Sequence, residues 1–303
     1  MGPYPPPISN LVEQRNLESL SHRFVLASND LELARRAADL IGEFAHTVRH
    51  SPPTAGSRGG TAPLVYALRS ESDIDGQPWY TLHRGDRQVA ASRDPGLVIS
   101  QLLWQISGDT VELAEGYLLI HAGAVVTPGG DGVVILGESG SGKTTLVAAL
   151  VQEGFGYLSD EAAAIELATG LAHPWPRPLG FKHGSRSLAR FAPLFPNGSE
   201  ESAASAHECH IPIGQIRRGA IAGPCRVRHV IDHCYTPGAP TRLDPLSRPI
   251  ALVRMGSAAP RLRREGDRGL AVLATVMQGA RAHRLVSGDL GQSVRAVRQR
   301  VER

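Results

Sequence analysis

The chain has 303 residues, 42% of them hydrophobic and 20% charged, which is the composition of an ordinary soluble globular protein with one large or two modest domains. Its net charge of +3 is spread along the chain, and the arginine-rich spot at 261–264 has no interleaved aromatic residues, so nucleic-acid binding is not expected. No apolar stretch is long enough to span a membrane, and three cysteines without paired spacing indicate a reducing, cytoplasmic compartment.

The first 115 residues predict a tail followed by a small α/β domain. Residues 1–20 begin with a cluster of prolines and predict a flexible tail, and the small domain is expected at 21–115. Within it, 22–28 predicts a strand, and a capping Asn-Asp pair precedes a helix expected over 31–48. The Pro-, Gly- and Ser-rich segment 49–62 predicts a mobile loop. Three antiparallel strands are then expected, at 64–68, 79–83 and 88–91, and a helix follows at 94–106.

Residues 116–303 predict a larger α/β domain. A strand at 118–126 leads through a Gly-rich turn to a second strand at 133–136, and a helix is expected at 143–153. The short strand 155–159 ends in an Asp-Glu pair. The rest predicts a hairpin (162–167 with 171–175), a flexible loop (195–208) and a strand (226–235). A helix (268–279), a strand (283–286) and a terminal helix (290–301) follow.

The segment Gly-Glu-Ser-Gly-Ser-Gly-Lys-Thr at 137–144 has the pattern of a phosphate-binding loop between a strand and a helix. Its glycines permit a tight turn whose backbone N–H groups point at phosphate oxygens, and the helix adds its N-terminal dipole. Lys143 is expected to reach the β- and γ-phosphates of ATP, and the Thr144 hydroxyl to ligate Mg²⁺. The expected nucleotide-binding residues are Gly137, Glu138, Ser139, Gly140, Ser141, Gly142, Lys143, Thr144 and Thr145.

Lysine is rare in this chain. Only two of the 32 basic residues are lysines, Lys143 and Lys182, so arginine serves wherever a generic cation suffices. A compact ammonium and a planar guanidinium are not interchangeable, and the two lysines therefore indicate positions that require an ammonium. We expect Lys182 to face phosphate or substrate, and Arg177 in the same Pro-rich segment is a further candidate.

The surroundings of the loop distinguish between classes of phosphate-loop protein. A transporter-type ATPase needs a signature loop shortly before a second acidic strand, whereas the nearest match here, 285–292, has no acidic strand after it. Instead, the acidic pair Asp160-Glu161 follows Thr144 by only 16 residues, and His121 precedes the loop on the expected strand.

The order of Ile-His-Ala-Gly-Ala-Val at 120–125, the loop, and Gly-Phe-Gly-Tyr-Leu-Ser-Asp-Glu at 154–161 resembles the HPr serine kinase/phosphorylase family. That family is similar to the nucleotide-binding domain of phosphoenolpyruvate carboxykinase. The segment 176–182 also resembles the smaller HPr-kinase-related proteins, some of which phosphorylate lasso-peptide precursors. The resemblance covers roughly residues 117–300 and implies an α/β phosphate-loop kinase domain of the HPr kinase/phosphoenolpyruvate carboxykinase type.

The resemblance also implies roles for the flanking residues. It favours Asp160 as the base that accepts the proton of an attacking hydroxyl and Glu161 as the metal-side carboxylate, with the reverse assignment left open. His121 would orient the acceptor or a phosphate oxygen. The expected catalytic residues are Asp160, His121 and Lys182, and the expected Mg²⁺ residues are Thr144 and Glu161.

These features predict an ATP- and Mg²⁺-dependent kinase that phosphorylates a hydroxyl, of serine in a peptide or small protein such as a lasso-peptide precursor. Two alternatives stay open: a small-molecule kinase on the same fold, acting for example on free serine, and a nucleotide-binding regulatory module with little turnover. The acidic pair argues against the module, because a sensor needs no base beside the γ-phosphate. The sequence does not specify an oligomeric state.

Overall fold

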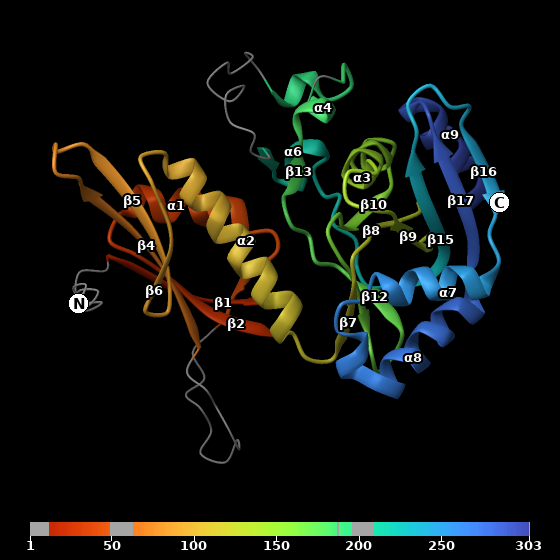
Figure 1. The fold of residues 1–303 in the computed structure, drawn as a ribbon, viewed down its shortest axis with the longest axis horizontal. Helices are drawn as coiled ribbons and strands as arrows, with labels where there is room; N and C mark the ends of the chain where they lie inside the picture. Colours follow the sequence, from red (N-terminus) through yellow and green to blue (C-terminus); the bar gives the residue numbers. More distant parts are fainter. Residues whose placement is uncertain (1–11, 49–62, 187, 196–208, 303) are drawn as a thin grey trace. The chain divides into compact units, whose positions relative to one another are not determined.

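The protein is a mixed α/β molecule of two compact units, divided between Glu115 and Gly116 (Figure 1). The computed structural model describes residues 12–48, 63–186, 188–195 and 209–302. The loop predicted at 49–62, and residues 196–208 of the second predicted loop, lie outside these ranges. No helix within them combines the length and the apolar character needed to cross a membrane.

In its described part, the first unit contains a six-stranded sheet with strand order β3-β1-β2-β4-β5-β6. Strands β2 and β4 run parallel and the other neighbours antiparallel, and α1 and α2 pack against the sheet. The elements are β1 Glu13–Ser19, β2 His22–Ser28, α1 Leu31–Ile41, β3 His46–Thr47, β4 Leu64–Ser72, β5 Pro78–Arg84, β6 Arg87–Ser92 and α2 Pro95–Leu113.

Several predictions in the first unit are wrong at their boundaries. The helix expected at 94–106 extends to Leu113, and the strand expected at 64–68 extends to Ser72. The flexible tail expected over 1–20 includes β1, which pairs along its whole length with β2. Residues 1–11 lie outside the described ranges. The helix expected to reach residue 48 begins after the Asp30 cap as predicted but ends at Ile41. The chain then turns, and β3 pairs with β1 instead of continuing the helix. Tertiary pairing overrode the helical periodicity here.

The second unit is built on a nine-stranded sheet in its described part, with the order β10-β8-β9-β15-β12-β11-β7, and with β17 and β16 added beside β15. A two-stranded sheet joins β13 to β14. The strands are β7 Tyr117–Ile120, β8 Gly123–Val126, β9 Gly132–Leu136, β10 Gly156–Ser159, β11 Ala163–Glu166, β12 Leu171–His173, β13 Leu179–Phe181, β14 Cys209–Ile211, β15 Cys225–Tyr235, β16 Arg242–Pro245 and β17 Arg281–Ser287.

Helices complete two apolar cores of this unit. One core joins sheet residues to α7 and α8, and the other joins them to α3 and α9 (Figure 1). The helices are α3 Lys143–Gln152, α4 His183–Arg186, η2 Ala192–Leu194, α6 Ile213–Ile216, α7 Arg248–Ser257, α8 Leu262–Gly279 and α9 Leu290–Val301. The predicted hairpin of β11 and β12 and the terminal helix α9 are confirmed. Helix α8 begins before the predicted residue 268 because its first turn precedes a non-helical Gly266.

The predicted strand over 118–126 is wrong, because the chain forms two strands with different partners. Strand β7 pairs with β11, whereas β8 pairs with β9 and β10. His121 lies between them, where its backbone N–H donates to the carbonyl oxygen of Ala258 at 2.7 Å. The break therefore puts His121 in a connection rather than on a strand, close to the end of α7.

Candidate active site

The phosphate loop connects β9 to α3 and is a tight turn. Strand β9 is buried along its whole length between β8 and the parallel strand β15, which fixes where the loop begins. Gly142 caps α3 at a φ of 85°, a conformation that side-chain-bearing residues rarely adopt. A Cβ on Gly137 would lie 2.5 Å from the Ser141 hydroxyl oxygen and 2.7 Å from the His233 carbonyl oxygen. Only glycine fits these two positions without displacing the loop.

Lys143 is buried inside the turn. Its ammonium donates hydrogen bonds to the carbonyl oxygens of Gly137 at 2.7 Å and Glu138 at 3.0 Å. The pKa of Lys143 is lowered, chiefly by burial. The carboxylates of Glu161 and Asp160 oppose this shift, and Lys182 adds to it. The second lysine and both carboxylates therefore act electrostatically on the ammonium of Lys143.

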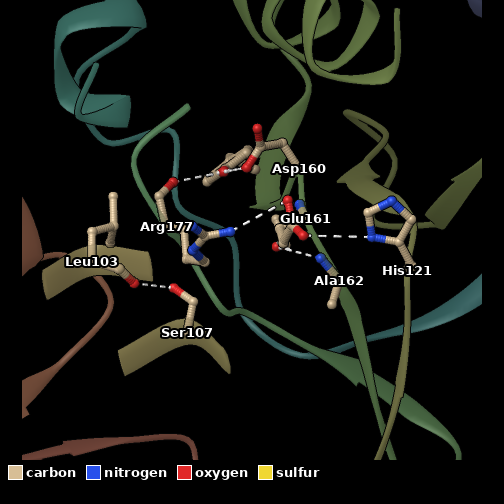
Figure 2. Close-up of polar contacts among 9 residues, drawn as sticks. Leu103, Ser107, His121, Asp160, Glu161, Ala162 and Arg177 are labelled. Atoms are coloured by element: carbon tan, nitrogen blue, oxygen red, sulfur yellow. Dashed lines mark hydrogen bonds and ion pairs between the residues drawn. The ribbon is translucent and has the colours of Figure 1, made fainter. Parts of the chain in front are cut away.

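Asp160 follows the last residue of β10 and is buried (Figure 2). The Tyr157 hydroxyl donates to its Oδ1 at 3.1 Å, and the Thr144 side chain favours the charged form of the same carboxyl group. Burial raises the pKa of Asp160 to about 6; Arg177 opposes the shift and Glu161 adds to it. The carboxyl group is thus poised to change charge near neutral pH, against the phosphate-loop threonine.

Glu161 lies between two basic side chains (Figure 2). Its Oε1 is 3.6 Å from Nδ1 of His121, an ion pair when the imidazole is protonated, and its Oε2 is 3.4 Å from Nη1 of Arg177. Arg177 is buried, with its guanidinium 5.6 Å from the centre of the Trp175 ring. Its carbonyl oxygen lies 2.8 Å from the Tyr157 hydroxyl, whose single hydrogen it shares with Asp160. Glu161 itself is about half exposed, at 47% of its side chain, so solvent and ligands can reach it.

A cavity of about 480 Å³ adjoins the other side of the loop. Its walls combine the loop with the ends of β15 and α7 and with Arg284 in the middle of β17, and His121 belongs to its lining. Asp232 stands opposite Leu136, the last residue of β9, in the parallel register of β15 with β9. Its Oδ2 is 3.7 Å from Nε of Arg254 and 3.6 Å from Nη1 of Arg284.

The structure brings most of the predicted residues together. His121, Asp160, Glu161, Lys143 and Thr144 form one connected set, and Lys182 is near enough to act on Lys143. The predicted nucleotide residues Gly137, Glu138, Ser139, Gly140 and Ser141 line the cavity. Thr145 is different, because its hydroxyl shares a 2.8 Å hydrogen bond with the Ser185 hydroxyl, which ties α3 to the segment after β13.

Three charged residues of the cavity were not predicted from the sequence: Asp232, Arg254 and Arg284. The run Val230-Ile231-Asp232 is an apolar strand segment that ends in an acid, and this signal would have indicated the site if the parallel pairing with β9 had been known. The two arginines carry no such signal, since arginine is the common surface cation of this chain.

No family model matches the chain, and no curated protein matches it. Among solved structures, the HPr(Ser) kinase/phosphatase from Coxiella burnetii is similar over 60% of this chain and 95% of that chain, with 13% sequence identity and a TM-score of 0.31. A likeness at this level carries no argument about activity. Any function for this chain must therefore follow from the site's own residues.

Proposed function

We propose that the chain is an ATP-dependent kinase that transfers the γ-phosphoryl group to a hydroxyl group. The influence of the Thr144 side chain on the Asp160 carboxyl group carries this proposal, because it joins the acidic pair to the phosphate loop. Phosphoryl transfer needs little covalent chemistry from a protein beyond positioning and charge neutralisation, and these residues supply both.

The loop is suited to the phosphates of ATP. Its backbone N–H groups and the N-terminus of α3 favour an anion, and Lys143 would exchange its two carbonyl partners for phosphate oxygens. The Thr144 hydroxyl and the Asp160 carboxylate are hard oxygen donors of the kind that Mg²⁺ prefers. Bound there, Mg²⁺ would neutralise charge on the phosphates.

The contacts support the reverse of the carboxylate assignment that the resemblance favours. Asp160 is influenced by Thr144, the threonine that is expected on the metal, whereas Glu161 faces His121, which lines the cavity. We therefore assign Asp160 to the metal side and Glu161 to the acceptor. Glu161 would take the proton of the acceptor hydroxyl as the new P–O bond forms and the bond to the β-phosphate breaks, leaving ADP with the electron pair.

Basic residues would balance the charge that develops. Arg177 holds Glu161 at 3.4 Å, and Lys182 acts on the ammonium of Lys143. A cation on each side of the transferred group would stabilise the equatorial oxygens of the transition state. His121 would position Glu161 or the acceptor through its Nδ1 contact.

For the acceptor we propose serine in a peptide or small protein, with a lasso-peptide precursor as the first candidate that the sequence resemblance suggests. A small-molecule kinase acting on free serine is the second candidate, and the cavity of about 480 Å³ favours it because that volume suits a small ligand.

The test uses γ-labelled ATP with Mg²⁺, serine-containing peptides, a lasso-peptide precursor and free serine. We expect label to pass to at least one acceptor, and Lys143→Met to abolish both ATP binding and transfer. ATP binding without transfer to any acceptor would argue for a nucleotide-binding regulatory module and against the kinase.

A further inference from the structure

The cavity beside the phosphate loop contains a charged cluster that the proposed kinase chemistry does not use. Arg254 extends from α7 and Arg284 from β17, and both guanidinium groups approach the same carboxylate oxygen of Asp232. Two positive charges against one negative charge leave the cluster with an excess of one positive charge. All three residues line the cavity together with His121 and the loop.

Asp232 orients the two arginines without consuming their donors. Its side chain is 11% exposed, whereas those of Arg254 and Arg284 are 46% and 47% exposed. The distances of 3.7 and 3.6 Å exceed the usual length of an N–H···O hydrogen bond. Each guanidinium has five N–H donors in a planar fork, so most of these donors remain available to an anion in the cavity.

A second observation shows that the cavity is built for a polar ligand. His233 lines it beneath Gly142 and is only 4% exposed, yet neither ring nitrogen has a hydrogen-bond partner among the described residues. Burial lowers the pKa of His233 to about 4, and Lys143 adds to this effect. The neutral ring therefore offers one donor and one acceptor, and leaving both unused in a buried place is costly.

We infer that this cavity binds the phosphoryl acceptor through an anionic group of that acceptor, a carboxylate or a phosphate, held by Arg254 and Arg284. The inference rests on the proposed kinase function and names the class of its substrate. An acceptor anchored by the arginines would extend toward His121, which lines the same cavity and contacts Glu161. Its hydroxyl would then meet the carboxylate that takes its proton.

The charge of the cluster favours an acceptor over the base or ribose of the nucleotide. Both of those groups are neutral and gain little from two guanidinium groups, whereas carboxylates and phosphates match the planar fork of arginine. The phosphates of ATP already have a cradle in the loop and in Lys143. The arginine cluster is thus a second anion site next to the first.

Isothermal titration calorimetry on the full chain loaded with Mg²⁺ and a non-hydrolysable ATP analogue tests the inference. The titrants are two pairs that differ in their anionic group: N-acetyl-L-serine with N-acetyl-L-serinamide, and glycerol 3-phosphate with glycerol. We expect at least one anionic compound to bind about 10- to 100-fold more tightly than its neutral twin, and Arg254→Gln and Arg284→Gln each to reduce that preference by about 10-fold. Which pair shows the preference distinguishes a carboxylate from a phosphate.

Arg281→Gln is the matched control, because Arg281 lies exposed on β17 and is absent from the cavity lining. Equal binding of both twins in the unaltered chain would overturn the inference. So would loss of affinity for the ATP analogue in the Arg254 or Arg284 variant, since the cavity would then belong to the nucleotide. Failure of the analogue to bind the unaltered chain would instead contradict the proposed kinase function. Thermal melting of each variant identifies any that fails to fold.

Discussion

Each unit holds a carboxylate among aromatic and basic residues, partly buried in the first unit and buried in the second, and the two carboxylates behave in opposite ways. In the first unit, Asp109 accepts hydrogen bonds from Nε and Nη2 of Arg84, both at 2.7 Å, and another from the Tyr66 hydroxyl. Burial alone would raise the pKa of Asp109, but the bonds from Arg84 and Tyr66 outweigh it and hold the pKa below its usual value.

In the second unit, burial dominates at Asp160. The Tyr157 hydroxyl donates to it, the Thr144 side chain favours its charged form, and the Arg177 guanidinium contacts Glu161. The pKa consequently rises to about 6. Asp109 has the bidentate partner that a structural ion pair requires, whereas Asp160 lacks it and keeps bonding capacity for a cation or a proton. Such unbalanced buried charges are concentrated at functional sites.

The largest expected effect on the rate of phosphoryl transfer comes from Glu161, in contrast to carboxylates with a structural role. Glu161→Gln removes the proposed proton acceptor, and we expect transfer to fall by about 10²- to 10⁴-fold with little change in ATP affinity. The matched control is Glu166→Gln, whose carboxylate pairs with His173 and Thr169 on the hairpin and should leave transfer unchanged. Single-turnover rates and ATP titrations measure the two quantities. A Glu161 variant that retained full activity would refute the assigned role.

Asp160→Asn should have a smaller effect that depends on Mg²⁺. An amide at this position weakens the metal side of the site, so we expect transfer to fall by about 10- to 100-fold at limiting Mg²⁺ and to recover partly at high Mg²⁺. Asp109→Asn, in the first unit, should show no such dependence. If excess Mg²⁺ did not rescue Asp160→Asn and Glu161→Gln remained active, the assignment with Asp160 as the base would be the correct one.

The sequence was sufficient for the local parts of this site. The loop, the helix at its end and the Asp160-Glu161 pair are close together in the chain. Their spacing was therefore enough to predict that they belong to one site. The break between β7 and β8 was not predicted, because apolar residues lie on both sides of His121 and the division depends on the choice of partner strands. The influence of Thr144 on Asp160 likewise depends on how β10 lies beside β8.

The arginine side of the cavity was beyond prediction for a different reason. Asp232, Arg254 and Arg284 come from three elements separated along the chain, and no fixed spacing relates them. Their meeting depends on the parallel pairing of β15 with both β9 and β17 and on the packing of α7. Sequence periodicity reports which face of an element is buried, and it does not report which other element that face meets.

Stability should respond in opposite directions when the two aspartates are neutralised. Asp109→Asn loses charge-assisted hydrogen bonds to a partly exposed Arg84, and we expect it to lower the free energy of unfolding by about 1–2 kcal/mol at neutral pH. Asp160→Asn removes a carboxylate that is costly to ionise inside the protein, and we expect it to raise the free energy of unfolding by about 2 kcal/mol above pH 6.

The pH dependence gives the sign of each effect. The folded-state pKa of Asp160 lies above the ordinary value of 3.8, so the native state loses stability as pH rises from about 4 to about 6, and the gain in Asp160→Asn should vanish near pH 4. For Asp109 the pKa is lowered, so its contribution is present at neutral pH and is lost in acid. Urea unfolding at several pH values measures both, and destabilisation of Asp160→Asn at pH 8 would contradict the comparison.

The smallest expected effect concerns the tyrosines beside the two aspartates. Tyr157→Phe removes a hydrogen bond to the charged form of Asp160, so the pKa of Asp160 should rise further, by less than about one unit. Because transfer requires the carboxylate, the rate should fall as pH drops through about 6 in the unaltered chain and through a slightly higher value in this variant.

Tyr66→Phe is the matched change in the first unit, since it removes the corresponding bond to Asp109. It should leave the pH–rate profile unchanged and alter only the acid limb of the unfolding curve, because the bidentate bonds from Arg84 persist. A profile that moved equally in both variants would mean that transfer senses the stability of the whole chain rather than the ionisation of Asp160. A shift confined to Tyr157→Phe would instead tie the acid limb of catalysis to one buried carboxyl group.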